Sequence, residues 1–131
     1  MISIDTNVLV RSLIDDDDHQ DKLARDFFKK ACLTEGLFIS SFVILETVWV
    51  LKTKKVQRSM IVELIEALLN TPQILISNQA LISAALSMYK NGRADFCDYL
   101  LLSDSLKYHV RELKTFDQKF AKEAQQFMSI M

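Results

Sequence analysis

Five acidic residues stand out, because each lies where a predicted strand meets or precedes a helix. They are spread over the whole chain and are Asp5, Glu46, Asp95, Asp98 and Asp117. Residues so far apart in sequence act together only if the fold gathers them. Gathered carboxylates without interleaved Arg or Lys repel one another, and a hard divalent cation with a preference for oxygen relieves that repulsion. The residue types therefore predict a site for Mg²⁺ or Mn²⁺.

Each of these acids also has a simpler interpretation, as a helix cap or as a solvated surface charge. Asp5 or Asp117, taken alone, is better explained as the cap of the helix that follows it. Glu46 has almost only apolar or β-branched neighbours, so we expect it to be partly buried, and we expect the same of Asp98. A buried carboxylate without a partner is costly unless a metal ion compensates it. Asp95 precedes Asp98 by three residues, so on a helix both point to one face.

The elements that must position these acids alternate between strands and helices. The predicted strands cover residues 1–4, 37–40, 74–76 and 112–116. The predicted helices cover residues 7–14, 19–32, a segment capped by Ser40 or Ser41, 61–69, 79–90, 95–108 and 117–126. Such alternation predicts an α/β fold in which a parallel sheet of four or five strands carries helices on both faces. Only two Gly and one Pro are present, which favours a helix-rich fold over an all-β one.

Three local patterns add detail to this outline. Leu23, Phe27 and Ala31 recur every four residues and predict a buried stripe on the second helix. Gly92 follows Asn91 and predicts an αL end for the helix over 79–90. The acidic run over residues 15–18 predicts a solvated loop that places negative charge before a helix, and we assign it no catalytic role.

Length and composition limit the class of protein. At 131 residues the chain is expected to form one domain over residues 1–131, with a core that needs no disulfide. Cys32 and Cys97 have no partner at metal-ligand spacing and are expected to be buried thiols. No secretory signal is visible, and the longest nearly uncharged stretch, residues 37–51, is too short to span a bilayer. We therefore expect a soluble, cytoplasmic protein that makes no contact with membranes.

At this point the motifs match a known family. The chain resembles the PIN-domain ribonucleases and, within them, the VapC-type toxins of bacterial and archaeal toxin–antitoxin pairs. The resemblance covers nearly the whole chain in order and spacing, and its segments are Ile4–Leu9, Ser40–Ser41, Val43–Glu46, Asp95–Asp98 and Thr115–Asp117. It implies a PIN-like parallel sheet flanked by helices. The tail, residues 127–131, leaves little room for the final strand of that family.

The resemblance implies a Mg²⁺- or Mn²⁺-dependent endoribonuclease. In that family an acid at each of four motifs forms the metal site, and the matched catalytic residues here are Asp5, Glu46, Asp98 and Asp117. Asp5 and Asp98 would be the main metal ligands. Asp117 would bind the metal beside them, and Asp95 would be an accessory ligand. The metal would polarise the phosphate and activate a water that attacks it. Glu46 and Asp117 would complete the ligand shell or orient that water.

The resemblance also implies partners, namely an RNA substrate, a cognate antitoxin whose C-terminal segment occludes the site, and a second copy of the chain in a homodimer. Because the net charge is −1, RNA must be held by local basic residues. The candidate RNA-binding residues are Thr6, Asn7, Lys52, Lys54, Lys55 and Arg58. Alternatively, Thr6 and Asn7 only begin a helix, and the lysines only complement the carboxyl end of another.

Three competing functions stay open. The first is a PIN nuclease outside any toxin pair, acting in RNA processing or on DNA, which the genomic neighbourhood would decide. The second is an inactive PIN fold used as a binding module, although such modules usually lose an acid and none is missing here. The third is a phosphate-accepting receiver, which requires adjacent acids after the first strand, whereas Asp5 is followed by Thr6 and Asn7.

Overall fold

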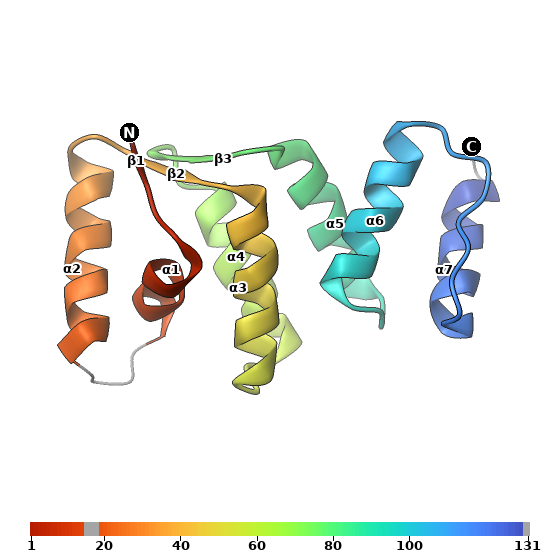
Figure 1. Cartoon of the computed structure of the whole chain (residues 1–131), viewed down its shortest axis with the longest axis horizontal. Coiled ribbons are helices and arrows are strands. Elements are labelled where there is room, and N and C mark those ends of the chain that lie inside the picture. The colour runs from red at the N-terminus through yellow and green to blue at the C-terminus, as the bar shows by residue number, and fades with distance from the viewer. Residues whose placement is uncertain (15–18, 130–131) are drawn as a thin grey trace. The chain divides into compact units, whose positions relative to one another are not determined.

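The computed structural model describes residues 1–14 and 19–129 (Figure 1). The predicted loop over residues 15–18 lies outside the described residues, as do residues 130–131 at the end of the tail. The chain divides into two compact units, Met1–Gln79 and Ala80–Met131. A single domain over residues 1–131 therefore stays a prediction.

The first unit contains a parallel sheet, which confirms the α/β class. Its strands are β1 (Ile2–Ser3), β2 (Leu37–Ile39) and β3 (Ile74–Ile76), in the order β1-β2-β3. The central strand β2 aligns its Leu37 with Ile2 on one side and with Ile74 on the other. Ile74 and Ile76 are buried whereas Leu75 is 48% exposed, so one face of β3 is covered more completely than the other.

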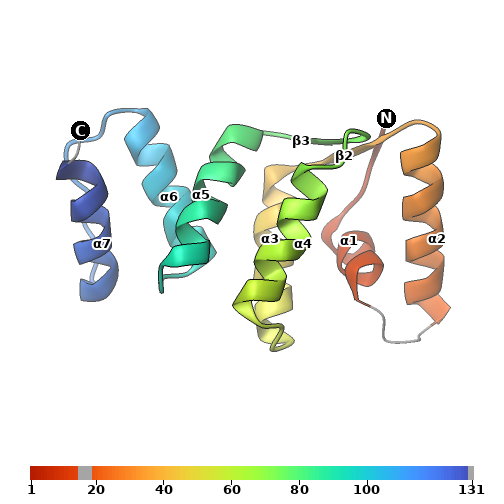
Figure 2. The same ribbon diagram turned by 180° about the vertical axis from the view of Figure 1, so that it is seen from behind.

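Four helices belong to the same unit, and in both views the longer ones have one end near the strands, while the shortest lies farther from them (Figures 1 and 2). They are α1 (Thr6–Leu13), α2 (His19–Leu33), α3 (Ser41–Thr53) and α4 (Arg58–Leu69). Helix α1 packs on both α2 and α3. The Oγ of Ser40 accepts the N–H of Phe42 at 3.2 Å, so the predicted cap of α3 is confirmed.

The predicted stripe on α2 is confirmed for Ala31 but is wrong for Leu23 and Phe27. Leu23 and Phe27 are 55% and 42% exposed, whereas Asp21 and Ala31 are buried. The helix is turned so that Asp21 faces α1, where it pairs with Arg11. A contact with another helix thus decides which side of α2 is buried, and the four-residue repeat of apolar residues could not reveal it.

The second unit consists of helices among its described residues. They are α5 (Gln79–Asn91, beginning at the last residue of the first unit), α6 (Phe96–Lys107) and α7 (Gln118–Ser129). Two edge-to-face aromatic pairs lie in its core. Tyr89 meets Phe96 with ring centroids 5.6 Å apart, and Tyr99 meets Phe120 at 6.2 Å. Helices α6 and α7 contact each other, so the second pair joins these two helices.

The strand predicted over residues 112–116 is not formed, and the described chain has three strands rather than four or five. Leu113 and Thr115 are half-buried while Lys114 and Phe116 are exposed, as in a strand with one covered face. No other strand pairs with this segment, however, and β-structure needs a hydrogen-bonded partner as well as a suitable pattern. Helix α7 continues to Ser129, so the described tail forms no fifth strand.

The predicted αL end at Gly92 is also wrong. Among the described residues the only glycine with a positive φ is Gly36, at 81°. A Cβ at Gly92 would instead strike the Tyr99 hydroxyl and would lie 2.5 Å from the Glu123 Oε1. Close packing, and not backbone conformation, therefore requires glycine at this position.

Two smaller expectations concern the thiols and the membrane. Neither Cys32 nor Cys97 forms a disulfide; Cys32 is half-buried, but Cys97 is exposed, which contradicts its predicted burial. Burial raises the pKa of the Cys32 thiol above its ordinary value.

None of the helices described here is both long enough and apolar enough to cross a membrane.

Candidate functional site

Asp5 follows the first strand, as predicted, and caps helix α1. The chain leaves β1 through the buried Ile4, and Asp5 adopts extended backbone angles of φ −92° and ψ 178°. Its Oδ1 accepts the N–H of Val8 at 3.0 Å. The side chain is exposed, and no residue of the described chain donates a hydrogen bond to Oδ2. The cap is confirmed, and one oxygen of the same carboxylate remains available to a ligand.

Glu46 lies in the middle of α3 and is exposed, so its predicted burial is wrong. The buried side of α3 is formed by Ile44, Thr47, Val48 and Leu51. The opposite side carries Glu46 between two exposed aromatic residues, Phe42 at 76% and Trp49 at 66%. Because α3 is apolar on nearly every side, apolar neighbours in sequence did not indicate a buried acid. Glu46 is instead a carboxylate accessible from solvent.

Asp95 and Asp98 lie at the start of α6 in the second unit. Asp95 occupies the N-cap position, although its side chain makes no cap hydrogen bond, and Asp98 is in the first turn. Asp95 is exposed and Asp98 is half-buried, as predicted for Asp98. Their spacing places both on one side of the helix, where the positive end of the helix dipole favours negative charge.

Asp117 caps the last helix, as predicted. Its Oδ1 accepts two backbone N–H groups, from Lys119 at 3.0 Å and from Phe120 at 3.1 Å. Its own N–H donates to the Oγ1 of Thr115 at 3.1 Å, which holds the chain before the helix. Asp117 thus resembles Asp5: Oδ1 caps a helix, while Oδ2 accepts no hydrogen bond within the described residues.

The candidate acids are therefore divided between the two units. Asp5 and Glu46 belong to the first, and Asp95, Asp98 and Asp117 belong to the second. Over residues 1–14 and 19–129, no group of three or more His, Cys, Asp or Glu side chains is close enough together to hold a metal ion. The donors themselves suit a hard cation, since all are carboxylates and two have an oxygen without a hydrogen bond. A single metal site built from these acids stays a prediction.

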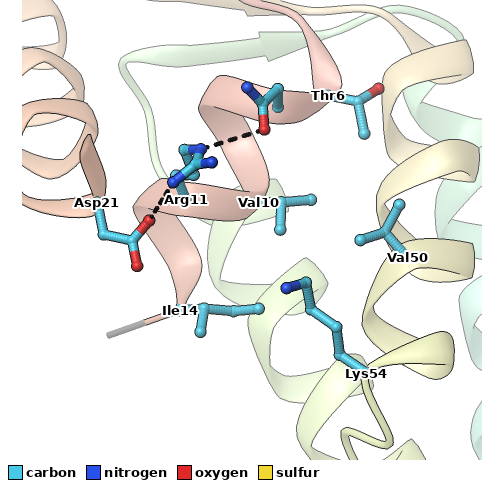
Figure 3. A pocket seen from close by; sticks show the side chains of 8 residues that line it. Thr6, Val10, Arg11, Ile14, Asp21, Val50 and Lys54 are labelled. Atoms are coloured by element: carbon cyan, nitrogen blue, oxygen red, sulfur yellow. Dashed lines mark hydrogen bonds and ion pairs between the residues drawn. The ribbon is translucent and has the colours of Figure 1, made fainter. Parts of the chain in front are cut away.

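A pocket of about 400 Å³ lies among α1, α2 and α3 of the first unit (Figure 3). It includes three of the predicted RNA-binding residues, Thr6, Asn7 and Lys54. Apolar side chains of Val10, Ile14 and Val50 form much of its remaining wall. Its lining begins one residue after Asp5, so the pocket adjoins the cap of α1.

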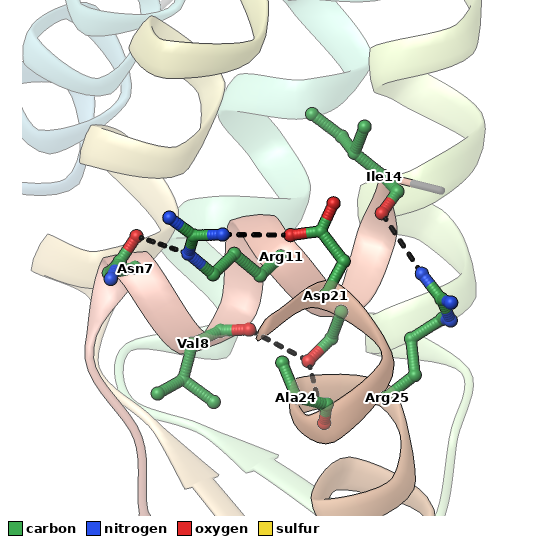
Figure 4. Close-up of polar contacts among 8 residues, drawn as sticks. Asn7, Val8, Arg11, Ile14, Asp21, Ala24 and Arg25 are labelled. Carbon is green, nitrogen blue, oxygen red and sulfur yellow. Dashed lines mark hydrogen bonds and ion pairs between the residues drawn. The ribbon is translucent and has the colours of Figure 1, made fainter. Parts of the chain in front are cut away.

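Arg11 and Asp21, which also line this pocket, were not predicted from the sequence (Figure 4). The Nη1 of Arg11 donates to the Oδ1 of Asp21 at 3.0 Å, and its Nε donates to the Oδ1 of Asn7 at 3.2 Å. The spacing of Asn7 and Arg11 fits a pair on one helix face. Asp21 is on a different helix, so no sequence pattern could have indicated its contact.

The charges around the pocket favour an anion. Arg11 is positive, but Asp21 lies against it and offsets its charge. Lys54 therefore provides the remaining positive charge of the lining, and Figure 3 shows its side chain directed into the pocket. Lys54 is exposed, so its ammonium group is accessible to a phosphate or carboxylate group that enters the pocket.

The other predicted basic residues belong to the connection from α3 to α4. Lys52 is in the last turn of α3, Lys55 is in the αL conformation with φ 65°, and Arg58 begins α4. None of these three lines the pocket. Lys52, Lys55 and Arg58 are thus close together in sequence, around the connection from α3 to α4. Their contact with RNA stays a prediction.

Comparison with known proteins gives two findings. The family model of the PIN domain matches residues 2–125. The chain is also 27% identical over 120 residues to a VapC ribonuclease of Aquifex aeolicus, an alignment that covers 91% of this chain and 89% of that protein. No solved structure matches the chain at a significant level. The family match spans both units and includes all five candidate acids.

Proposed function

Because the chain belongs to the PIN domain family, as its motifs predicted, we propose that it is a metal-dependent nuclease that hydrolyses RNA. The observation that carries this proposal is the family match over residues 2–125, within which every candidate acid is retained. Similarity to a VapC ribonuclease supports RNA as the substrate.

Asp5, Asp98 and Asp117, with Asp95 as an accessory, are the residues proposed to hold the metal. Mg²⁺ or Mn²⁺, when bound, supplies Lewis acidity at the phosphate and makes a water more nucleophilic. Asp5 and Asp117 can each contribute Oδ2 while Oδ1 continues to cap a helix. Glu46, which is exposed on α3, would orient the attacking water and accept its proton. The four aspartates and Glu46 thus have separate tasks.

The pocket of the first unit is proposed to receive part of the RNA strand. Lys54 would pair with a phosphate, and Thr6 and Asn7 would donate hydrogen bonds near Asp5. Lys52, Lys55 and Arg58 would contact phosphates farther along the strand. Backbone contacts of this kind position RNA without reading its sequence. The proposed function therefore includes RNA binding that weakens as salt concentration rises.

We further propose that the nuclease is the toxin of a toxin–antitoxin pair, that it forms a homodimer, and that it acts in the cytoplasm. The support is the similarity to a VapC ribonuclease over most of both chains. Under this proposal, induced expression stops bacterial growth with the wild-type chain and not with Asp5→Asn. Growth arrest by both proteins would overturn the toxin role while leaving the nuclease activity to be tested by itself.

The nuclease is tested by incubating the purified chain with labelled single-stranded RNA and with DNA of the same sequence, in Mg²⁺, Mn²⁺ or excess EDTA. We expect cleavage of RNA with either metal and none in EDTA. Full cleavage in EDTA would contradict metal dependence, and cleavage of DNA alone would contradict the substrate. Asp104→Asn is the matched control, because Asp104 is an exposed acid of α6 outside the candidate site.

A further inference from the structure

The start of α6 is tied to α7 by one buried hydroxyl group. Tyr99 has no exposed surface. Its hydroxyl donates to the Oε1 of Glu123 on α7 at 2.7 Å, and it accepts the N–H of Ala94 at 3.1 Å. The hydroxyl thus both donates and accepts a hydrogen bond, and it joins three segments of the second unit.

The packing around this hydroxyl leaves no spare room. Gly92 lies so close that a single added carbon would strike Tyr99. The Tyr99 ring also packs edge to face on Phe120. Phe120 and Glu123 are three residues apart, so both lie on one side of α7. The turn from α5 to α6 and one side of α7 therefore both pack against the side chain of Tyr99.

The residues that Tyr99 contacts are neighbours of three candidate acids. Asp98 directly precedes Tyr99, and Ala94 directly precedes Asp95. Phe120, which packs on the ring, donates its N–H to the Oδ1 of Asp117 at 3.1 Å. One buried side chain thus restrains the backbone next to every candidate acid of the second unit.

We propose that Tyr99 and Glu123 form a positioning pair that fixes the backbone beside Asp95, Asp98 and Asp117, the proposed metal ligands of the second unit. The inference rests on the proposed function, since it assigns a supporting role for that same site. Ligands held in place by their neighbours lose less freedom when a metal binds. Loss of a group hydrogen-bonded to a ligand costs about 10- to 100-fold in metal affinity, and Tyr99, which acts through the backbone beside the ligands, is expected at the lower end of that range. A purely structural hydroxyl, in contrast, would affect stability alone.

Tyr99→Phe tests the pair, because it keeps the ring and removes only the hydroxyl. Mn²⁺ affinity is measured by titration calorimetry on the full chain, and the Mg²⁺ concentration for half-maximal RNA cleavage is measured separately. We expect the Mn²⁺ Kd to rise about 10-fold. Tyr108→Phe is the control, since it removes the hydroxyl of an exposed tyrosine at the other end of α6, and its Mn²⁺ Kd is expected to equal that of the wild type.

Two variants of Glu123 keep the test decisive if Tyr99→Phe does not fold. Glu123→Ala removes the acceptor and is expected to raise the Mn²⁺ Kd in the same direction. Glu123→Gln keeps an acceptor oxygen and is expected to restore most of the affinity. A wild-type Kd in folded Glu123→Ala or Tyr99→Phe would overturn the positioning role alone. A wild-type chain that binds no Mn²⁺ would overturn the proposed function together with it.

Discussion

The two units position their candidate acids by different means. In the first unit, Asp5 follows a strand whose backbone is hydrogen-bonded within a sheet. In the second, Asp95, Asp98 and Asp117 lie at helix starts, and side chains such as Tyr99 hold those starts in place. A carboxylate can thus be placed by a paired backbone or by packed side chains. The second arrangement should be more sensitive to single substitutions.

The largest effect is expected from removing one acid of each unit. Asp5→Asn and Asp98→Asn should each reduce RNA cleavage by at least about 100-fold, which corresponds to about 3 kcal/mol of lost transition-state stabilisation. Cleavage rates at saturating Mg²⁺ measure this. Asp26→Asn and Asp104→Asn are the controls, as exposed acids of α2 and α6. A large loss of cleavage from one of these two substitutions and none from the other would mean that Asp5 and Asp98 do not share a site.

Metal removal should reveal the repulsion among the acids. Mg²⁺ at 100 times its Kd would stabilise the wild type by about 2.7 kcal/mol, since only the folded chain forms the site. Asp98→Asn should gain much less. In EDTA the variant should be at least as stable as the wild type, because it lacks one like charge. Thermal melts measure both quantities, and a variant clearly less stable in EDTA would identify Asp98 as a structural acid.

The two glycines provide a direct contrast between the units. Gly92→Ala should destabilise the chain by about 1–3 kcal/mol through overpacking against Tyr99. Gly36→Ala should cost about 1 kcal/mol, because its φ of 81° disfavours a side chain. Asn tolerates positive φ, so Gly36→Asn should be milder than Gly36→Ala, whereas Gly92→Asn should be no milder than Gly92→Ala. Denaturant melts measure these differences in the free energy of unfolding. If Asn were milder than Ala by the same amount at both positions, packing and backbone conformation would not be the separate reasons for the two glycines.

A smaller effect is expected from the pocket of the first unit. Lys54→Gln should weaken RNA binding to all sequences alike and lower the slope of log affinity against log salt by about 1. Binding is measured in EDTA, so that cleavage does not interfere. Lys29→Gln is the control, because Lys29 is an exposed lysine of α2 outside the pocket. An unchanged salt slope would exclude a phosphate contact for Lys54.

The smallest effect concerns Thr47, beside Glu46 on α3. Thr47 is fully buried, and its Oγ1 has no hydrogen-bond partner among the described residues. Thr47→Val replaces that hydroxyl with a methyl group of similar size and should raise the free energy of unfolding by about 1 kcal/mol. Thr47→Ser keeps the hydroxyl and serves as the comparison. A loss of stability in Thr47→Val would mean that the hydroxyl has a partner after all.

Sequence reasoning succeeded where structure is decided locally. The cap of Ser40 and those of Asp5 and Asp117 follow from residue types next to a helical pattern. The strands at residues 37–39 and 74–76 follow from short apolar runs. Each of these features depends on only a few consecutive residues, so the sequence contains the information needed.

Sequence reasoning failed where a segment distant in sequence determines the local structure. The strand over residues 112–116 lacks a partner, and no pattern within it could show that. The orientation of α2 depends on Arg11, and the need for glycine at position 92 depends on Tyr99 and Glu123. Glu46 was expected to be buried because its neighbours are apolar, yet only the packing of α3 decides which side faces solvent.

The contact between Arg11 and Asp21 has a consequence for how this protein can evolve. Asp21 is 4% exposed, and Arg11 is its ion-pair partner. Loss of Arg11 alone would leave a buried charge uncompensated, at a cost of about 3–5 kcal/mol, whereas replacing both residues with apolar ones can be neutral. Positions 11 and 21 should therefore change together in descendants of this sequence, and lineages that keep one charge should keep the other.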